Sequence, residues 1–98
     1  MIEVSFHRLA AKEVREAFAY YAARSRRAAF RFASSLDAAI LRIASDPDSH
    51  PVELQHFRWA RVRQFPFRLV FERKDSERIL ILALAHTSRR PRYWRGRA

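Results

Sequence analysis

The sequence predicts an α+β domain built from one short N-terminal strand, an antiparallel helical hairpin and an antiparallel three-stranded sheet. Three observations predict this class. Apolar and polar residues alternate from 2 to 6, two longer segments carry apolar residues at helical spacing, and three strand-like segments follow one clear loop. The 98 residues contain no internal repeat and no linker, so we expect a single domain over 1–98.

The first strand is expected over residues 2–6, where Ile2, Val4 and Phe6 alternate with polar residues. Side chains of a strand point to alternate faces, so this strand is half buried. A first helix should follow, from about Arg8 to Arg24. Its apolar positions recur at steps of three and four, as a helix with one buried face requires, and comprise Ala10, Val14, Ala17, Phe18 and Tyr21.

A second helix is expected to begin after Ser25, whose side chain can accept a hydrogen bond from an amide of the first turn. Its buried stripe comprises Ala29, Phe32, Ala33, Leu36, Ala39, Ile40 and Ile43. The helix ends near Asp46, because a proline disfavours helical geometry in the residue before it, and residues 46–51 form a loop. The tight junction between the two helices makes them an antiparallel hairpin.

Three further strands are expected over residues 57–65, 67–73 and 78–86, the last two joined by a polar turn at 74–77. Pro66 cannot donate a backbone hydrogen bond, so it separates the first two of these strands. The segment Ile79–Ala85 is apolar at every position. We therefore expect the last strand in the middle of the sheet, covered on both faces by the chain itself or partly by a partner.

Arginine dominates the charge of the chain. Lysine and arginine number 20 against 10 acidic residues, which gives a net charge of +10, and 18 of the 20 are arginine. The excess is C-terminal, because residues 1–56 carry eight basic and seven acidic side chains and residues 57–98 carry twelve and three. A one-sided field of this kind attracts anions, and arginine binds carboxylates and phosphates well. We expect an acidic protein segment or a nucleic acid as partner.

The composition also excludes several classes of protein. The absence of cysteine excludes disulfides and thiolate metal sites, and a single glycine, Gly96, excludes the glycine-rich phosphate loops of nucleotide-binding enzymes. The four histidines fall in separate segments, so we expect no metal and no cofactor. The N-terminus lacks the pattern of a signal peptide and the longest apolar run has seven residues. We expect a cytoplasmic protein without membrane contact.

Two groups of side chains could bind an anionic partner. Along the expected strand over 57–65, Trp59, Arg61 and Arg63 share one face. They can hold a nucleic acid or an acidic peptide, or form an ordinary solvated face with the indole packed on arginine stems. The second group lies near the expected hairpin tip and comprises Arg24, Arg26, Arg27 and Arg31. We expect these arginines to be solvated, although cations at a helix start oppose the helix dipole and call for a further reason.

The densest group of reactive side chains begins at His86, which ends the last expected strand and precedes an arginine-rich tail with Tyr93 and Trp94. A histidine can transfer protons near neutral pH, and arginine can stabilise charge on a phosphate. Such groups can support RNA cleavage, in which a base activates the 2′-hydroxyl against the adjacent phosphate. The alternative is structural: His86 bonds to the tail, and Tyr93 and Trp94 anchor the tail to the sheet.

The order and spacing of these segments resemble the RelE/ParE superfamily of toxins from type II toxin–antitoxin systems, with the ParE-like branch closer. The resemblance rests on Val4 to Glu13, Phe18 to Tyr21, Phe32 to Pro47, Arg58 to Phe71, Ile79 to His86 and Arg90 to Trp94. It covers nearly the whole chain. It implies a small cytoplasmic toxin that arrests growth and is held inactive by a cognate antitoxin, whose flexible acidic or amphipathic segment wraps it.

The two branches of the superfamily imply different targets. RelE-like toxins cut messenger RNA on the ribosome, and the resemblance would then give catalytic roles to His86, Arg61 and Tyr93, with Arg63 as the alternative to Arg61 for binding phosphate. ParE-like toxins inhibit DNA gyrase without known catalysis. This branch is favoured because lysines are nearly absent and His86 lies at a strand end. A third alternative is a non-toxic module that only binds its antitoxin, and we leave open whether the chain is an enzyme.

The resemblance also suggests which side chains contact each partner. The residues expected to contact a target or a nucleic acid are Trp59, Arg61, Arg63, Arg89, Arg90, Arg92 and Trp94. The residues expected to contact the antitoxin are Arg58, Arg63, Arg68 and Arg90. Plasmid stabilisation and higher-order toxin–antitoxin assemblies are further expectations of the same resemblance.

Overall fold

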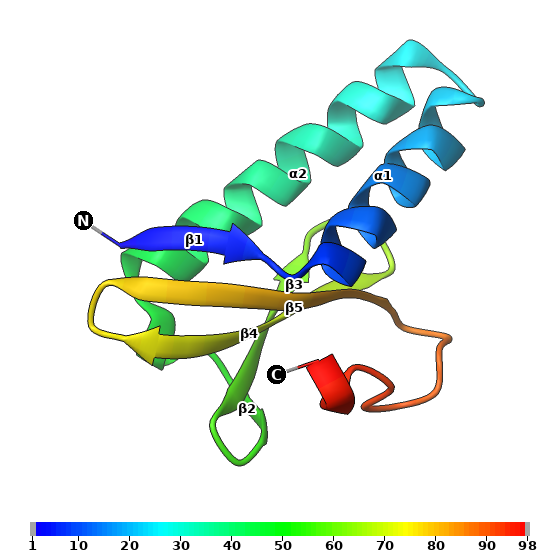
Figure 1. The fold of residues 1–98 in the computed structure, drawn as a ribbon. Coiled ribbons are helices and arrows are strands. Elements are labelled where there is room, and N and C mark those ends of the chain that lie inside the picture. Colours follow the sequence, from blue (N-terminus) through cyan, green and yellow to red (C-terminus); the bar gives the residue numbers. More distant parts are fainter. Residues whose placement is uncertain (1, 98) are drawn as a thin grey trace.

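A computed structural model describes residues 2–97 and confirms the α+β class: two helices lie on one face of a five-stranded mixed sheet (Figure 1). The helices are α1 (Arg8–Ala22) and α2 (Arg26–Ser45), and the strands are β1 (Glu3–Phe6), β2 (Val52–Leu54), β3 (Phe57–Val62), β4 (Phe67–Asp75) and β5 (Arg78–His86). Short 3-10 segments lie at Pro47–Ser49 and Arg95–Arg97. In residues 2–97, no helix is long and apolar enough to cross a membrane.

The sheet has the strand order β1-β5-β4-β3-β2. Strands β3, β4 and β5 form the predicted antiparallel meander, and β1 pairs with β5 in parallel. Strand β5 thus lies between β1 and β4, which confirms its predicted interior position. Strand β2 pairs antiparallel with β3 and was not predicted, because three residues are too few to show a period-2 pattern.

The helical hairpin agrees with the prediction except at the end of α1 and at Phe18, which was expected on the buried face and is exposed because the hairpin extends past the sheet there (Figure 1). The Ser25 hydroxyl accepts a hydrogen bond from the Ala28 amide at 3.0 Å, so Ser25 is the predicted cap of α2. Helix α1 ends at Ala22 rather than at Arg24, because the chain turns there to enter α2. Of the predicted stripe of α2, five residues are buried (Ala29, Phe32, Leu36, Ala39 and Ile43), and Ala33 and Ile40 are partly buried.

Strand β3 ends three residues earlier than predicted. A tight turn, in which the Phe65 amide donates to the Val62 carbonyl at 3.2 Å, takes the chain out of the sheet before Pro66. Gln64 adopts a positive φ of 71° in this turn, a conformation that most side chains disfavour. The turn folds Phe65 back onto the hairpin, where its ring lies 5.0 Å from that of Tyr21 and 5.4 Å from that of Phe32.

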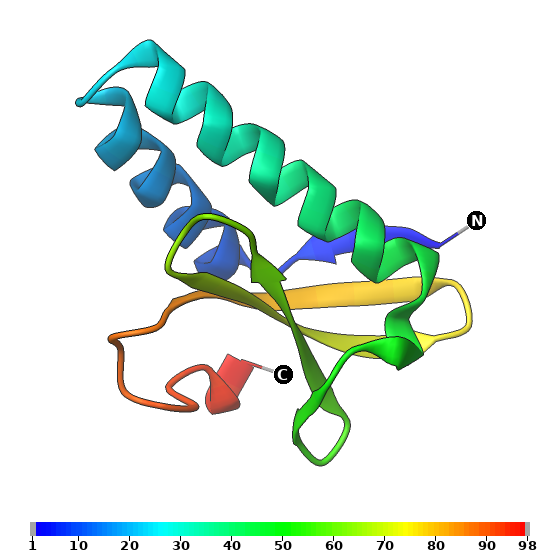
Figure 2. The same cartoon turned by 180° about the vertical axis from the view of Figure 1, so that it is seen from behind.

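The sheet has two different faces, the helix side and the tail side (Figure 2). The helix side carries the larger core, in which Phe32 of α2 packs with sheet residues such as Leu69 and Ile81. The C-terminal tail, residues 87–97, crosses the opposite face and covers a second cluster. The apolar sequence of β5 therefore reflects burial on both faces, as predicted.

An extra residue in β5 changes which face its side chains occupy. Val70 of β4 is opposite Ala83, but Phe71 is opposite Ile81, so Leu82 bulges from the ladder. As a result Leu82 and Ala83 both lie in the tail-side cluster, whereas Leu84 returns to the helix side. The bulge therefore lets β5 contribute side chains to the cores on both faces of the sheet.

Two phenylalanines of α2 provide a test of this packing. Phe32 is fully buried and Phe30 is 72% exposed. Phe32→Ala should lower the free energy of unfolding by about 3–5 kcal/mol, because it leaves a cavity in the core. Phe30→Ala should change it by less than about 0.5 kcal/mol. Urea unfolding followed by tryptophan fluorescence measures both values, and equal losses in the two variants would contradict the assigned helix face.

Candidate functional site

The C-terminal tail is held on the sheet by one buried aromatic side chain. Trp94 is 3% exposed and packs in the tail-side cluster with Phe57, Val70, Leu82 and Ala83. Its ring meets that of Phe57 edge-on, with centroids 5.3 Å apart. The structure thus supports the structural alternative for Trp94, which anchors the tail and offers little surface to a target.

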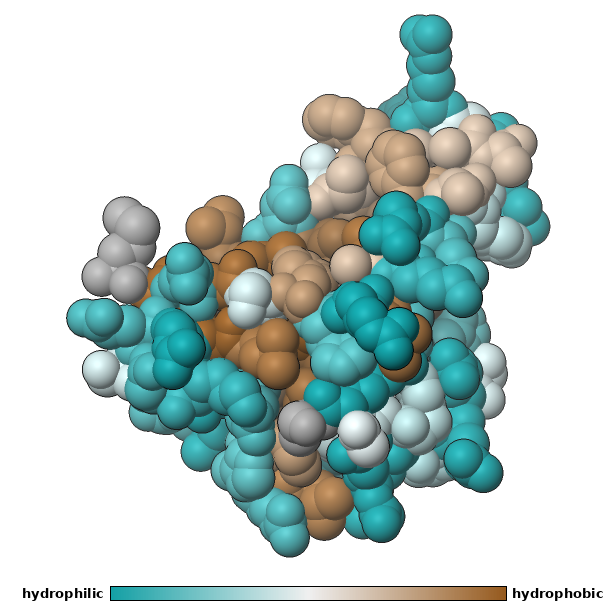
Figure 3. Space-filling model, in the orientation of Figure 1, coloured by the Kyte–Doolittle hydropathy of each residue, from teal (hydrophilic) through white to brown (hydrophobic). Residues whose placement is uncertain are grey.

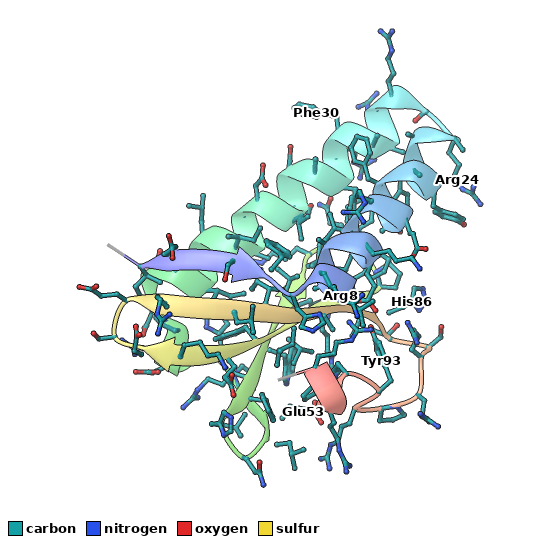
Figure 4. All side chains as sticks on the ribbon, in the orientation of Figure 1. Arg8, Arg24, Phe30, Glu53, His86 and Tyr93 are labelled. Carbon is teal, nitrogen blue, oxygen red and sulfur yellow. The ribbon has the colours of Figure 1, made fainter. Side chains whose placement is uncertain are left out.

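A cleft lies between the tail and the sheet, and we call it the tail cleft. It encloses about 360 Å³ and is lined by Glu53, Arg68, Val70, Ala85, His86, Thr87, Arg89, Arg90, Pro91, Arg92, Tyr93 and Trp94. Figure 4 shows Glu53, His86 and Tyr93 grouped around the tail. Four arginines and a single carboxylate line the cleft, so it attracts anions.

The one carboxylate of the tail cleft, Glu53 on β2, binds two of its arginines. Its oxygens lie 3.4 Å from Nη1 of Arg68 and 3.2 Å from Nε of Arg92. Arg92 also donates to the Glu53 carbonyl at 3.3 Å and adopts a positive φ of 59°, which places the tail turn over β2. Among the described residues Arg90 makes no ion pair, so it is available to a partner.

A second carboxylate, Glu13 of α1, also holds the tail in place. Arg97 donates to both of its oxygens, at 2.9 and 3.0 Å, and the Tyr93 hydroxyl donates at 2.8 Å. Arg89 lies 3.4 Å away. The carboxylate also accepts the backbone amide of Leu84 at 3.1 Å. One partly buried carboxylate therefore ties α1, β5 and the tail together.

The phenol of Tyr93 is kept neutral by this arrangement. Burial raises the pKa of Tyr93 well above its usual value, and the hydrogen bond to the Glu13 carboxylate adds to the rise. The guanidinium of Arg89 stacks on the ring, 3.7 Å from its centroid. Tyr93 is thus a structural donor whose proton is committed to Glu13.

His86 lies at the end of β5, where it lines the tail cleft. Its Nδ1 accepts the backbone amide of Ser88 at 3.0 Å and lies 2.7 Å from the Ser88 hydroxyl. When the ring is neutral, the amide bond places its proton on Nε2. The ring also packs edge-on against Phe67, with centroids 5.2 Å apart. His86 therefore orders the start of the tail.

A smaller cleft of about 280 Å³ adjoins the tail cleft and shares Arg68 with it. It is lined by Trp59, Arg61, Phe65, Pro66, Phe67, Arg68 and Thr87. Arg61 and Arg68 are directly opposite each other on β3 and β4, and the guanidinium of Arg68 lies 4.0 Å from the ring centroid of Trp59. Like charges at opposite positions destabilise a sheet, so this pair favours binding of an anion.

Two predicted contact residues lie away from both clefts. Arg58 is on the helix side of β3 by strand alternation and donates to the His50 carbonyl at 2.6 Å, which ties the preceding loop to the sheet. Arg63 lies in the turn after β3 and is exposed. Of the four arginines expected to contact an antitoxin, only Arg68 and Arg90 therefore line the tail cleft.

Sequence reasoning missed the two carboxylates that shape the site. Glu13 had a detectable signal: it lies three residues after Ala10 and four before Ala17, so it occupies the buried face of α1. An acid at such a position needs partners. Glu53 had no such signal, because its role depends on strand β2 folding back against β3.

The described residues 2–97 contain no group of three His, Asp or Glu side chains that could hold a metal ion. The family model described as "ParE toxin of type II toxin-antitoxin system, parDE" matches residues 4–91. That match includes the sheet except Glu3, the first residue of β1, together with the hairpin and the first part of the tail, while Tyr93, Trp94 and Arg97 follow it. A comparison with curated proteins found no match.

Replacing Glu13 by glutamine should loosen the tail. The variant removes the charge that Arg97 and Arg89 share, and hydrogen bonds to charged groups contribute about 1.5–3 kcal/mol each. We expect trypsin to cleave the tail at least tenfold faster in Glu13→Gln than in the wild type. Glu16→Gln, on the exposed side of the same helix, is the control and should leave the rate unchanged. Equal cleavage of wild type and Glu13→Gln would contradict the role of this carboxylate.

The raised pKa of Tyr93 makes stability depend on alkaline pH. Below about pH 10 the phenol is protonated in both the folded and the unfolded chain. Above that pH the unfolded chain loses its proton while the folded chain retains it, so the free energy of unfolding falls as the pH rises. Urea unfolding between pH 8 and 11 should show a smaller decline in Tyr93→Phe than in the wild type. An identical decline would show that Tyr93 ionises equally in both states.

Proposed function

Since the chain belongs to the ParE toxin family of type II toxin–antitoxin systems, we propose that it arrests growth by binding DNA gyrase and that its antitoxin neutralises it through the tail cleft. The family implies a cognate antitoxin as partner. Gyrase acts on chromosomal and plasmid DNA, so the proposal places the toxin in the cytoplasm and is consistent with a role in plasmid stabilisation.

The observation that carries the proposal is the charge imbalance of the tail cleft. Four arginines surround one carboxylate, Glu53, which already contacts Arg68 and Arg92. Arg90 remains without an acidic partner among the described residues. An acidic antitoxin segment would supply the missing carboxylates, and a chain that orders on binding can follow the cleft along the tail.

The same geometry favours binding over RNA cleavage. The Tyr93 hydroxyl donates to Glu13, and Nδ1 of His86 accepts the amide of Ser88. Arg61 lines the neighbouring smaller cleft, whereas His86 and Tyr93 line the tail cleft. Two of the three groups that a ribonuclease would use are thus engaged in holding the tail.

Contacts with the target are proposed for the surface around Trp59 and Arg61. Both residues face the tail side of the sheet, and Arg61 is exposed. This surface shares Arg68 with the tail cleft. An antitoxin segment bound in the tail cleft would therefore compete for a residue of the target surface, which provides a route to neutralisation.

Expression of the chain alone should arrest growth, and the purified protein should inhibit supercoiling by gyrase while cellular messenger RNA stays intact. Co-expression of a short reading frame from directly upstream, encoding the antitoxin, should restore growth. Codon-phased cuts in messenger RNA together with normal supercoiling would favour the endonuclease instead. Absence of any growth arrest would favour a non-toxic antitoxin-binding module.

Substitutions of two tail arginines distinguish binding in the tail cleft from an effect of net charge alone. Arg90 lines the tail cleft, whereas Arg95 lines a different cavity beside Gln55 and Phe57. Arg90→Ser should bind the antitoxin at least tenfold more weakly, since a charge-assisted contact contributes about 1.5–3 kcal/mol. Arg95→Ser should bind within twofold of the wild type. Equal weakening by both substitutions would mean that net charge, not the cleft, holds the antitoxin.

A further inference from the structure

The helical hairpin ends in a basic and aromatic tip that neither cleft uses. We define the hairpin tip as residues 17–31, which include the end of α1, the connection at 23–25 and the start of α2. No acidic residue occurs between Glu16 and Asp37, and the tip carries four arginines: Arg24, Arg26, Arg27 and Arg31. Figures 1 and 2 show the hairpin projecting beyond the sheet. The first residues of the tip, Ala17, Tyr20 and Tyr21, line a cavity together with His86 and Arg89, whereas Phe30 and the four arginines of the tip do not line it.

The fold makes little use of the tip arginines. Arg24 stacks on the ring of Tyr20 and donates to its hydroxyl at 2.6 Å. Arg26, Arg27 and Arg31 are exposed and make no hydrogen bond or ion pair with side chains or backbone elsewhere in residues 2–97. Their charge therefore faces solvent without compensation.

The positions of these arginines are also unfavourable for helix stability. Arg26 and Arg27 occupy the first turn of α2, where the helix dipole disfavours cations, and no acid balances them there. Arg27 and Arg31 are four residues apart on the same helix, so their charges repel each other. Local choices that oppose the fold in this way are expected at functional sites.

Large apolar side chains lie among the arginines. Phe30 is 72% exposed, Tyr20 52% and Phe18 44%. Figure 3 shows apolar surface on the hairpin where it extends past the sheet, and Figure 4 places Phe30 and Arg24 at that end. Aromatic and arginine side chains are enriched at the centres of protein–protein interfaces, where each can contribute much of the binding energy.

We propose that the hairpin tip is a second contact with the toxin's target, in which a partner protein receives Phe30 in an apolar depression rimmed by carboxylates. Charge selects the partner, because four unpaired or weakly paired guanidinium groups need acidic groups opposite them. The exposed rings favour a protein over a nucleic acid, since a phosphate backbone satisfies the arginines but gives Phe30 no pocket. The inference rests on the proposed function and adds a contact separate from the tail cleft.

The test uses purified gyrase as the probe and compares two exposed apolar residues of one helix. Phe30 lies in the tip, and Leu41 is 67% exposed eleven residues further along α2, on the same face but away from the tip. Phe30→Ser should raise the concentration needed to inhibit supercoiling at least tenfold and should slow growth arrest. The double variant Arg27→Ser, Arg31→Ser should act in the same direction. Leu41→Ser should match the wild type, and all variants should bind the antitoxin within twofold of the wild type.

Each outcome decides between the two proposals. If the wild type is active and Phe30→Ser is equally active, the role proposed for the hairpin tip is wrong, while the proposed function stands. Equal losses in Phe30→Ser and Leu41→Ser would also overturn that role, because the effect would not be specific to the tip. Binding of a 20-base-pair DNA duplex that depends on Arg27 and Arg31 but not on Phe30 would replace the protein partner by a nucleic acid. Wild type that neither arrests growth nor inhibits gyrase would refute the proposed function and, with it, this inference.

Discussion

The mismatch in length between β1 and β5 is the constraint on which the rest of the structure depends. Strand β1 has four residues and β5 has nine, so the second half of β5 has no strand beside it on that edge. Unpaired backbone groups at a partly buried edge are costly, and proteins cover them. Here Glu13 accepts the Leu84 amide and Arg97 donates to the Leu82 carbonyl at 3.0 Å. Side chains of α1 and the tail thus complete the ladder, and the tail cleft exists because the tail must stay there.

The need to hold the tail in place determines the role of the few acidic residues in a chain with a net charge of +10. Glu13 binds Arg97 and lies near Arg89, and Glu53 lies between Arg68 and Arg92. Two carboxylates therefore hold four of the C-terminal arginines and leave a cleft that still carries excess positive charge. Arginine is suited to this double use, since its planar group can bond a carboxylate on one edge and stack on an aromatic ring with its face. Arg68 and Arg89 do both.

Sequence patterns predicted the elements that local residue patterns determine. They missed the elements that form only when distant parts of the chain pair with each other. Periodicity predicted both helices, the residue type of Ser25 predicted the cap, and the continuous apolar run of Ile79–Ala85 predicted the interior position of β5, because each of these signals is local in the sequence. The three residues of β2 and the bulge at Leu82 have no period, and they follow from pairing with β3 and β4. At the site, the composition indicated the basic residues, and the grouping of reactive side chains along the sequence indicated His86 and Tyr93. The hydrogen bonds of His86 with Ser88 and of Tyr93 with Glu13 depend on the folded structure, and no local sequence pattern predicts them.

The tail is held by two kinds of interaction that do different work. Burying an aromatic side chain of 150–250 Å² at about 25 cal/mol per Å² contributes roughly 4–6 kcal/mol as an upper estimate, so Trp94 supplies a large share of the energy of attachment. Apolar burial is not directional, however, and would tolerate several placements of residues 87–93. The bonds of Glu13 and Glu53 are directional, and they select the one placement that leaves Arg90 over the cleft. A partner that competes for these carboxylate contacts can therefore rearrange the cleft while Trp94 keeps the tail attached.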